Sequence, residues 1–236
     1  MVDHTFGGPW TEIKLDAVEY YLQCYTSALK RANFDLTYID AFAGSGTRDV
    51  EREVGGLLES PAIVKETLEG SARRAIGVRP AFDHFVFIEM NRARYGALSK
   101  VATEFPDLDI EVIRGDANEK LDALVRQEPW SRKDRSRSRG VVFLDPYALH
   151  VDWKTLQALA STHVLDVWYL FPIRDTIRQL ARNFSGIGPK EPMLDRLLGI
   201  EWRELYSIPH EIGGNLFDDV VEAELKRVVS VRQFEQ

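Results

Sequence analysis

The segment Leu36-Thr-Tyr-Ile-Asp-Ala-Phe-Ala-Gly-Ser-Gly46 decides the fold. Its first part is rich in β-forming residues and predicts a short strand. The glycines at its end, Gly44 and Gly46, predict a sharp turn at which the backbone approaches a ligand closely. Taken alone this pair is a weak signal, and its weight comes from the sequence around it.

Outward from this segment, β-rich runs alternate with helical stretches. Besides residues 36–42, strands are predicted at 84–89, 109–113, 140–145 and 165–171, and helices at 11–32, 91–104, 151–161 and from 116 onward. Such alternation indicates parallel strands joined by crossover helices. We therefore expect an α/β fold with a doubly wound, mainly parallel sheet of the Rossmann-like type.

This pattern divides the chain into three segments. Residues 1–35 are expected to form an N-terminal helical segment, 36–172 the α/β core, and 173–236 a helical C-terminal region. Within the core, 47–59 is expected to be a polar loop. Ser60-Pro61 is expected to open a helix, because serine caps helices and proline suits their first turn. The C-terminal helices are predicted at 174–183, 193–206 and 216–229.

Charge and residue content narrow the classes of function. The 236 residues carry a net charge of −7, which argues against a surface wholly dedicated to nucleic acid but leaves room for a local basic strip such as 131–139. The single cysteine, Cys24, excludes an intrachain disulfide, and the histidines show no metal-ligand spacing, so no metal is implied. Without a signal sequence or an apolar run of membrane length, a cytoplasmic protein with no membrane partner is expected.

Acidic residues stand at the ends of four predicted strands or in the turn just after: Asp40, Glu89, Asp116 and Asp145. Ligands of open α/β sheets bind outside the carboxyl ends of the strands, so these side chains are expected to converge on one site. The alternative for each acid is a helix cap, which is a common role of aspartate. Four acids in register favour the shared site.

The acids also discriminate between ligands. A dinucleotide fingerprint requires a third glycine or alanine where this chain has Asp49, and Asp40 would repel a phosphate. S-Adenosylmethionine has no phosphate, and its ammonium, sulfonium and hydrogen-bond donors suit an acidic site. The charge pattern therefore favours S-adenosylmethionine over NAD.

Asp40-Ala-Phe-Ala-Gly-Ser-Gly46 resembles the first motif of class I S-adenosylmethionine-dependent methyltransferases. The resemblance implies that this loop receives the methionine part of the cofactor, that Glu89 holds the ribose hydroxyls, and that Asp116 binds the adenine amino group. The cofactor-binding residues that it implies are Asp40, Phe42, Gly44, Gly46, Glu89, Asp116 and Ala117.

Asp145-Pro-Tyr147 resembles the fourth motif of amino-methyltransferases, which implies that Asp145, Pro146 and Tyr147 are catalytic. In that role Asp145 and the Pro146 carbonyl accept the N–H groups of an exocyclic amine, and Tyr147 stacks on a planar base. The alternative is a strand stopped by proline, with Tyr147 packed in the core.

More narrowly, the chain from about residue 10 to 172 resembles the three-Cys-motif partner proteins. These are methyltransferase-like proteins encoded beside a separate cysteine-motif protein. The segments that carry the resemblance are Trp10-Thr-Glu-Ile-Lys-Leu15, Tyr38-Ile-Asp-Ala-Phe-Ala-Gly44, Ser60-Pro61, Phe143-Leu-Asp-Pro-Tyr147 and Trp168-Tyr-Leu-Phe-Pro172.

The chain departs from the family pattern at three places. One proline precedes Tyr147 where the amino-methyltransferases have two. The interval from Asp40 to Glu89 is about twice the customary one, which requires an insertion at 47–59. No closing pair of strands is evident near the C-terminus, so the sheet is expected to lack it and the chain to be truncated there.

The function expected from these patterns is methyl transfer from S-adenosylmethionine to an exocyclic amine of a nucleic acid or nucleotide. The alternative is a cofactor-binding subunit without turnover that assists a neighbouring cysteine-motif protein. The single proline before Tyr147 favours the alternative, while Asp40, Glu89 and Asp116 support cofactor binding in both.

Overall fold

The computed structural model describes residues 9–54, 62–127, 129–130, 137–207 and 226–227. The chain forms two compact units. Unit 1 comprises Met1–Asp145 with Ala158–Tyr169, and unit 2 comprises Pro146–Gln157 with Leu170–Gln236.

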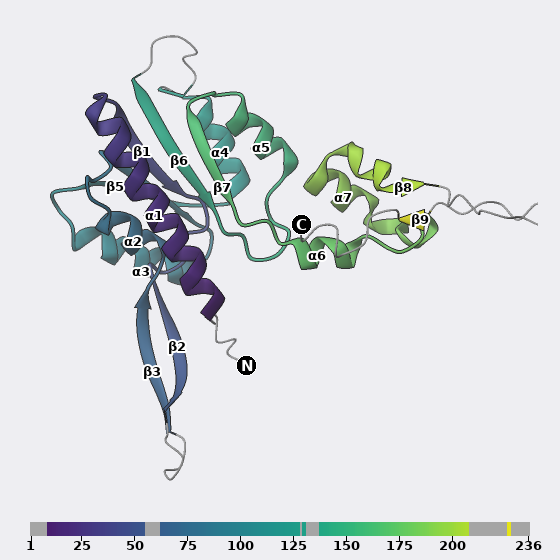
Figure 1. Ribbon diagram of the computed structural model, residues 1–236, viewed down its shortest axis with the longest axis horizontal. Helices are drawn as coiled ribbons and strands as arrows, with labels where there is room; N and C mark the ends of the chain where they lie inside the picture. Colours follow the sequence, from purple (N-terminus) through teal and green to yellow (C-terminus); the bar gives the residue numbers. More distant parts are fainter. Residues whose placement is uncertain (1–8, 55–61, 128, 131–136, 208–225, 228–236) are drawn as a thin grey trace, which may run out of the picture. The chain divides into compact units, whose positions relative to one another are not determined.

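Unit 1 is built on a five-stranded sheet with the order β5-β4-β1-β6-β7, in which every pair is parallel (Figure 1). The strands are β1 (Asp35–Asp40), β4 (His84–Glu89), β5 (Asp109–Arg114), β6 (Ser138–Leu144) and β7 (Leu165–Tyr169). Counted along the chain, the parallel strands have the order 3-2-1-4-5, which is typical of doubly wound sheets. The predicted fold class is confirmed.

Burial explains why the three central strands are so apolar. In β1 every residue after Asp35 is buried, and the last five residues of β4 and of β6 are buried as well. Strands covered on both faces read as continuous hydrophobic runs. In the outer strands β5 and β7 every residue is exposed or half-buried, as expected at the edges of a sheet.

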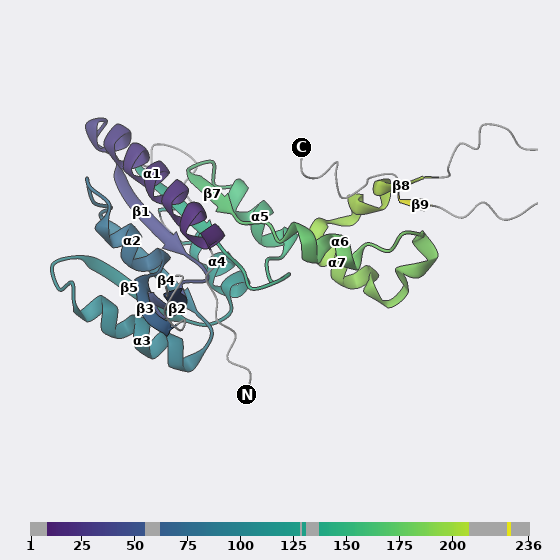
Figure 2. The ribbon, with the colours of Figure 1, turned by 60° about the horizontal axis from the view of Figure 1, so that its bottom comes forward.

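Helices cover both faces of this sheet. The helices of unit 1 are α1 (Pro9–Arg31), α2 (Ser71–Gly77), α3 (Arg92–Thr103) and α4 (Ala117–Val125), while α5 (Trp153–Ala160) runs from unit 2 into unit 1. In Figure 1, α1 passes in front of the sheet and α4 lies behind it; Figure 2 shows the same helices from another side. Among neighbours in contact, α1 packs on β1 and α2, and α3 on β4 and β5.

The predicted loop at 47–59 and the helix expected to start at Ser60-Pro61 are wrong. Residues 47–69 instead contain the antiparallel strands β2 (Thr47–Val54) and β3 (Ala62–Glu69), which extend away from the sheet (Figure 1). Ser60 and Pro61 themselves lie outside the described residues. β2 and β3 pair with each other, and this pairing outweighs the preference of Ser60-Pro61 for the start of a helix.

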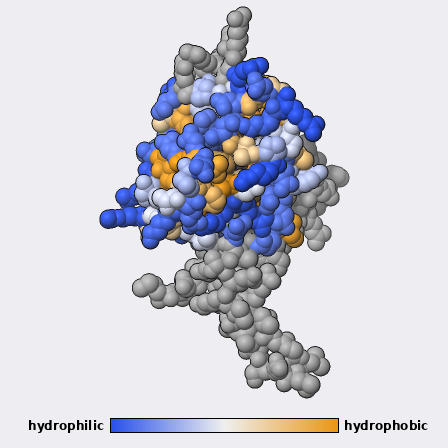
Figure 3. All heavy atoms as spheres, turned by 90° about the vertical axis from the view of Figure 1, so that its left-hand side faces the viewer, coloured by the Kyte–Doolittle hydropathy of each residue, from blue (hydrophilic) through white to orange (hydrophobic). Residues whose placement is uncertain are grey.

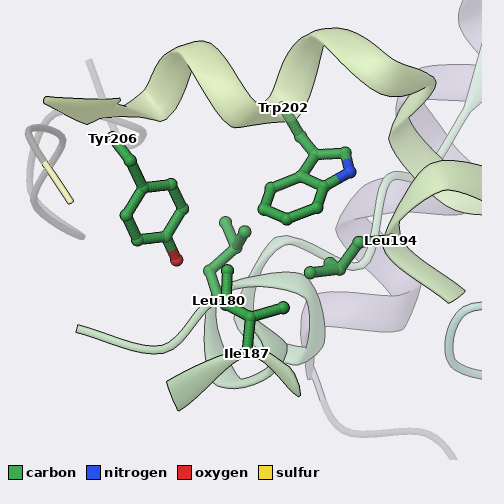
Figure 4. Packing of buried hydrophobic residues seen from close by; sticks show 5 residues of the cluster. All are labelled: Leu180, Ile187, Leu194, Trp202 and Tyr206. Carbon is green, nitrogen blue, oxygen red and sulfur yellow. The ribbon is translucent and has the colours of Figure 1, made fainter. Parts of the chain in front are cut away.

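Unit 2 has a small core of its own. It contains α6 (Ile173–Gln179), η1 (Phe184–Gly186), η2 (Gly188–Lys190), α7 (Glu191–Leu198), η3 (Ile200–Leu205), β8 (Tyr206–Ser207) and β9 (Lys226–Arg227). Figure 4 shows the side chains that form this core, Leu180, Ile187, Leu194, Trp202 and Tyr206. The Trp202 ring stacks on Phe184 and meets Tyr206 edge-on.

The predicted C-terminal helices are only partly present. The helix expected at 174–183 ends at Gln179, and the one expected at 193–206 is divided at Gly199, whose φ of 74° is left-handed and terminates α7. The helix expected at 216–229 lies largely outside the described residues, and within it Lys226–Arg227 pairs as a short strand with β8.

The surface of the chain is mainly hydrophilic on the face drawn in Figure 3, with apolar side chains gathered in one area. None of the helices in the described part of the chain is both long and apolar enough to cross a membrane.

Candidate functional site

The sheet order brings the carboxyl ends of three neighbouring strands together. Asp40, the last residue of β1, pairs with Phe87 of β4 on one side and with Phe143 of β6 on the other. Glu89 and Asp145 therefore follow two residues further along, on either side of it. The strand order reverses between β1 and β6, and doubly wound sheets bind their ligands at this point.

Asp40 is a buried acid that makes no ion pair with a cation in the described part of the chain. Its side chain is fully buried, its Oδ2 accepts a hydrogen bond from Ser71 Oγ at 2.5 Å, and its Oδ1 accepts one from the Phe42 backbone N–H at 3.1 Å. Burial raises the pKa of Asp40 to about 7, against the two hydrogen bonds, and the charges of Asp145 and Glu89 raise it further. Strongly perturbed acids of this kind cluster at functional sites.

Glu89 and Asp116 are joined through the backbone. Glu89 is 7% exposed, its Oε1 accepts the Asn91 N–H at 2.7 Å, and its carbonyl accepts the Gly115 N–H at 3.3 Å. The turn that carries Asp116 therefore lies against the end of β4. Three of the four strand-end acids, Asp40, Glu89 and Asp145, interact electrostatically, and the fourth is tied to the same edge of the sheet.

Asp116 also caps a helix, as the alternative interpretation of the strand-end acids predicted. Its Oδ1 accepts the N–H groups of Asn118 at 2.9 Å and Glu119 at 3.2 Å, which caps α4. Ala117, the first residue of that helix, is buried. The cap uses one carboxylate oxygen, so an acid at this position can cap the helix and still present its second oxygen.

Asp145 follows β6 directly and is half-buried. Burial raises the pKa of Asp145, and the charge of Lys14 on α1 opposes this rise. Lys14 is thus a neighbour of the site, although its own side chain is exposed.

Tyr38 adds a buried hydroxyl to the same region. It lies two residues before Asp40 on β1, so both side chains point to one face of the sheet. Its hydroxyl is buried and has no hydrogen-bond partner among the described residues. Burial holds the pKa of Tyr38 well above its usual range, with smaller contributions from Asp40 and Asp145.

The two glycines of the loop after β1 have different surroundings. Gly44 and Gly46 have φ values of +64° and +77°, a region that favours glycine. A Cβ at Gly44 would meet nothing within 4 Å, whereas one at Gly46 would lie 3.2 Å from Val101 and 3.3 Å from Leu98 of α3. Gly44 therefore faces open space, and Gly46 permits close packing of the loop on α3.

Pro146 and Tyr147 belong to unit 2, although Asp145 belongs to unit 1. Pro146 is buried, and Tyr147 is 63% exposed, so the alternative that Tyr147 packs in the core is wrong. Tyr147 lines a hollow of about 570 Å³, together with Ala148, Leu149, His150, Asp175, Arg178, Gln179, Met193 and Arg196. Its ring lies beside that of His150, with 6.4 Å between the centroids.

Two side chains at this edge of the sheet were missed by the sequence reasoning, Ser71 and Tyr38. Ser71 reaches Asp40 because β3 returns the chain to Gly70, whose N–H donates to the Gly46 carbonyl at 3.0 Å. The only sequence signal for it was the Gly70-Ser71 pair at a helix start, which a helix placed at Ser60 conceals. In the described part of the chain, no three His, Cys, Asp or Glu side chains are grouped as they would be around a metal ion.

No protein-family model matches the chain, and no curated protein gives a match. Among solved structures, protein LPL1258 from Legionella pneumophila, described as DUF519, is 18% identical over 56% of this chain and 56% of that one, with a TM-score of 0.39. A conserved hypothetical protein from Streptococcus pyogenes is 20% identical over 64% of this chain and 76% of that one, with a TM-score of 0.35. The match thus spans just over half the length of the Legionella protein.

Proposed function

We propose that this protein binds S-adenosylmethionine at the carboxyl ends of β1, β4 and β5 and transfers its methyl group to an exocyclic amine of a nucleic acid or nucleotide. The observation that carries the proposal is Asp40, a fully buried acid with two further acids as its electrostatic neighbours. A buried carboxylate without a cation is costly, and a bound cation offsets that cost.

The residues at this edge fit the chemical groups of the cofactor. Asp40 supplies negative charge beside the glycine loop, where the ammonium of the methionine part would lie. Glu89 offers acceptor oxygens for a ribose diol, and Asp116 has one oxygen beyond its cap for an adenine amine. Gly44 leaves open space at the turn, so a ligand can approach the backbone there.

When bound, the cofactor supplies an electrophilic methyl group on a sulfonium. Its methyl group would pass from sulfur to the amine nitrogen, which would leave a neutral thioether and release one proton from the amine. Asp145 would accept a hydrogen bond from the amine and then this proton, which the raised pKa of its half-buried carboxyl favours. Tyr147, which is exposed, provides a stacking surface for a planar base.

Calorimetric titration with S-adenosylmethionine and its demethylated product tests the cofactor site. Asp40→Asn should weaken binding by at least about 2 kcal/mol, because a buried charge partner is lost. Asp107→Asn, which removes an exposed acid from a loop, should leave the affinity unchanged. If the wild-type protein binds neither compound, or if the two variants behave alike, the cofactor proposal is wrong.

Transfer of a tritiated methyl group to single-stranded DNA and RNA tests the reaction. The wild type should incorporate label, and Asp145→Ala should not, while its cofactor affinity stays within about twofold of the wild type. Tyr147→Phe should retain activity and Tyr147→Ala should lose it, because the ring and not the hydroxyl makes the stack.

The second candidate is a cofactor-binding subunit without turnover, and the single proline before Tyr147, where the amino-methyltransferases have two, favours it. In this candidate the acids at the strand ends bind the cofactor, and a separate cysteine-motif protein completes the catalytic site. Cofactor binding by the wild type, without label on any nucleic acid but with label once such a partner is added, would decide for this candidate.

A further inference from the structure

The surface of α3 carries a hollow of about 690 Å³ beside the glycine loop. Its lining residues are Ser45, Thr47, Arg73, Arg92, Ala93, Gly96, Ala97, Lys100, Val101 and Glu104. Three small residues of α3, at positions 93, 96 and 97, leave the helix surface open between the longer side chains. Another chain can therefore approach this helix closely.

The charge of this hollow is opposite to that of the protein. Three cations line it against one acid, in a chain whose net charge is −7. The acid, Glu104, is bound to Arg73 at 2.8 Å. Arg92 and Lys100 are exposed, and neither makes an ion pair with another described residue.

The spacing of the two unpaired cations indicates an extended anion. Arg92 and Lys100 lie eight residues apart on α3, which is about 12 Å along the helix axis at 1.5 Å per residue. Neighbouring phosphates on one strand of a duplex are separated by roughly 3.4 Å along the axis, so this interval reaches more than one phosphate. A single phosphate occupies only one end of it.

We propose that the hollow on α3 binds the phosphodiester backbone of a nucleic acid, with Arg92 and Lys100 as its phosphate contacts. The inference does not depend on the cofactor site, since no residue assigned to that site lines the hollow. It supplies a binding surface for a macromolecule on a chain that is acidic as a whole.

Fluorescence anisotropy with a labelled, single-stranded oligothymidylate, measured over a range of salt concentrations, tests this proposal. The wild type should bind with an affinity that falls as salt rises. The double substitution Arg92→Gln with Lys100→Gln should weaken binding roughly tenfold and reduce the salt slope by about 1.4, since each single-strand contact contributes about 0.7. Arg92→Lys with Lys100→Arg keeps both charges and should retain the wild-type slope.

Arg94→Gln is the matched control, because Arg94 is an exposed cation of the same helix that does not line the hollow. It should leave affinity and salt slope nearly unchanged, and thermal melting should show that all variants fold. Equal losses for Arg94→Gln and for the double substitution, or no loss in either, would overturn the proposal. Saturation by inorganic phosphate alone, with no tighter binding of the oligonucleotide, would overturn it too and leave a small-anion site.

Calorimetric titration of the double substitution with S-adenosylmethionine keeps this proposal separate from the function proposed above. Cofactor affinity should equal that of the wild type. Loss of oligonucleotide binding with intact cofactor binding supports the phosphate contacts. Absence of cofactor binding in the wild type, with oligonucleotide binding present, rejects only the methyl-transfer proposal.

Discussion

Asp40 shows how the burial of a single acidic residue makes stability depend on pH. Its carboxyl has a pKa of about 7 in the folded chain, against an ordinary value of 3.8, because burial disfavours its charge. Between these values the folded chain holds a proton that the unfolded chain releases. The contribution of Asp40 to stability is therefore fully present below about pH 4 and is lost as the pH rises through 7.

This linkage predicts that the stability of Asp40→Asn relative to the wild type is higher at pH 8 than at pH 4. The asparagine stays neutral, so the variant avoids the loss in free energy of unfolding that ionisation of Asp40 causes in the wild type. This loss is at most about 4 kcal/mol, from the difference between the pKa of about 7 and the ordinary 3.8. Urea unfolding of both proteins at pH 4, 6 and 8 measures the difference. A constant difference across this range would show that Asp40 does not titrate near neutral pH.

If S-adenosylmethionine binds at Asp40 as proposed, the same pKa predicts how its affinity depends on pH. A cationic ligand binds the ionised carboxyl, so the proton must leave Asp40 first, and affinity should fall up to tenfold per unit below about pH 7. Glu89, Asp145, Tyr38 and Ser71 are the polar neighbours that share this environment. Calorimetry in buffers of different ionisation enthalpy should detect the proton released, and Asp40→Asn should abolish it.

The two glycines of the loop predict a second contrast between residues. Gly44→Ala should cost about 1 kcal/mol, since its positive φ is strained for alanine but its Cβ meets no neighbour. Gly46→Ala has the same backbone strain and also presses on Leu98 and Val101, so it should cost more. Thermal melting ranks the pair, and the reverse order would contradict the packing described for this loop.

At the scale of elements, the polar residues at helix starts have separable roles. Asn91 caps α3 through the N–H groups of Ala93 and Arg94, and Asp116 caps α4 in the same way. Either cap is worth about 1 kcal/mol. Asp116, unlike Asn91, is also proposed to bind the cofactor, so its proposed role adds to the cap that it makes.

Two substitutions of Asp116 separate these roles. Asp116→Asn keeps an acceptor for the cap, so stability should change by less than about 0.5 kcal/mol, while Asp116→Ala should lose about 1 kcal/mol. If the carboxylate contacts the adenine amine, both variants should bind S-adenosylmethionine more weakly. If Asp116→Asn binds S-adenosylmethionine with the affinity of the wild type, the carboxylate does not contact the cofactor and Asp116 only caps α4.

The sequence predicted those elements whose cause is local or whose burial is complete. The strands ending at Asp40, Glu89 and Leu144 were predicted because they are rich in β-forming and apolar residues, which the sheet buries on both faces. The hairpin β2–β3 was missed because its stability comes from pairing between two segments. For the same reason the contact of Ser71 with Asp40 was invisible, since it depends on where the hairpin returns the chain.

At the scale of the whole molecule, the chain has two units with separate cores. In unit 2, Trp202 is 3% exposed, and its indole N–H donates to Asp195 at 2.7 Å. Removing this side chain affects a core that shares no buried residue with the sheet of unit 1. Stability is therefore expected to be distributed between the units and not held in one cooperative block.

This division predicts the outcome of Trp202→Ala. The substitution should destabilise unit 2 by about 3–5 kcal/mol and leave the sheet of unit 1 intact. Hydrogen exchange should speed up in 173–206 and remain slow in β1, β4 and β6. Trp153→Ala, which removes a partly exposed ring from the same unit, should have a smaller effect. Uniformly faster exchange through both units would show that they unfold together.

The hairpin β2–β3 begins and ends at one place, because the Gly70 N–H donates to the Gly46 carbonyl at 3.0 Å. A segment whose two ends touch is an insertion, and its length does not affect the positions of β1 and α2. Such an insertion can become longer or shorter in evolution, or be replaced, without a change in the strand order of the sheet. Protein engineers can use the same place to graft a foreign peptide or a reporter.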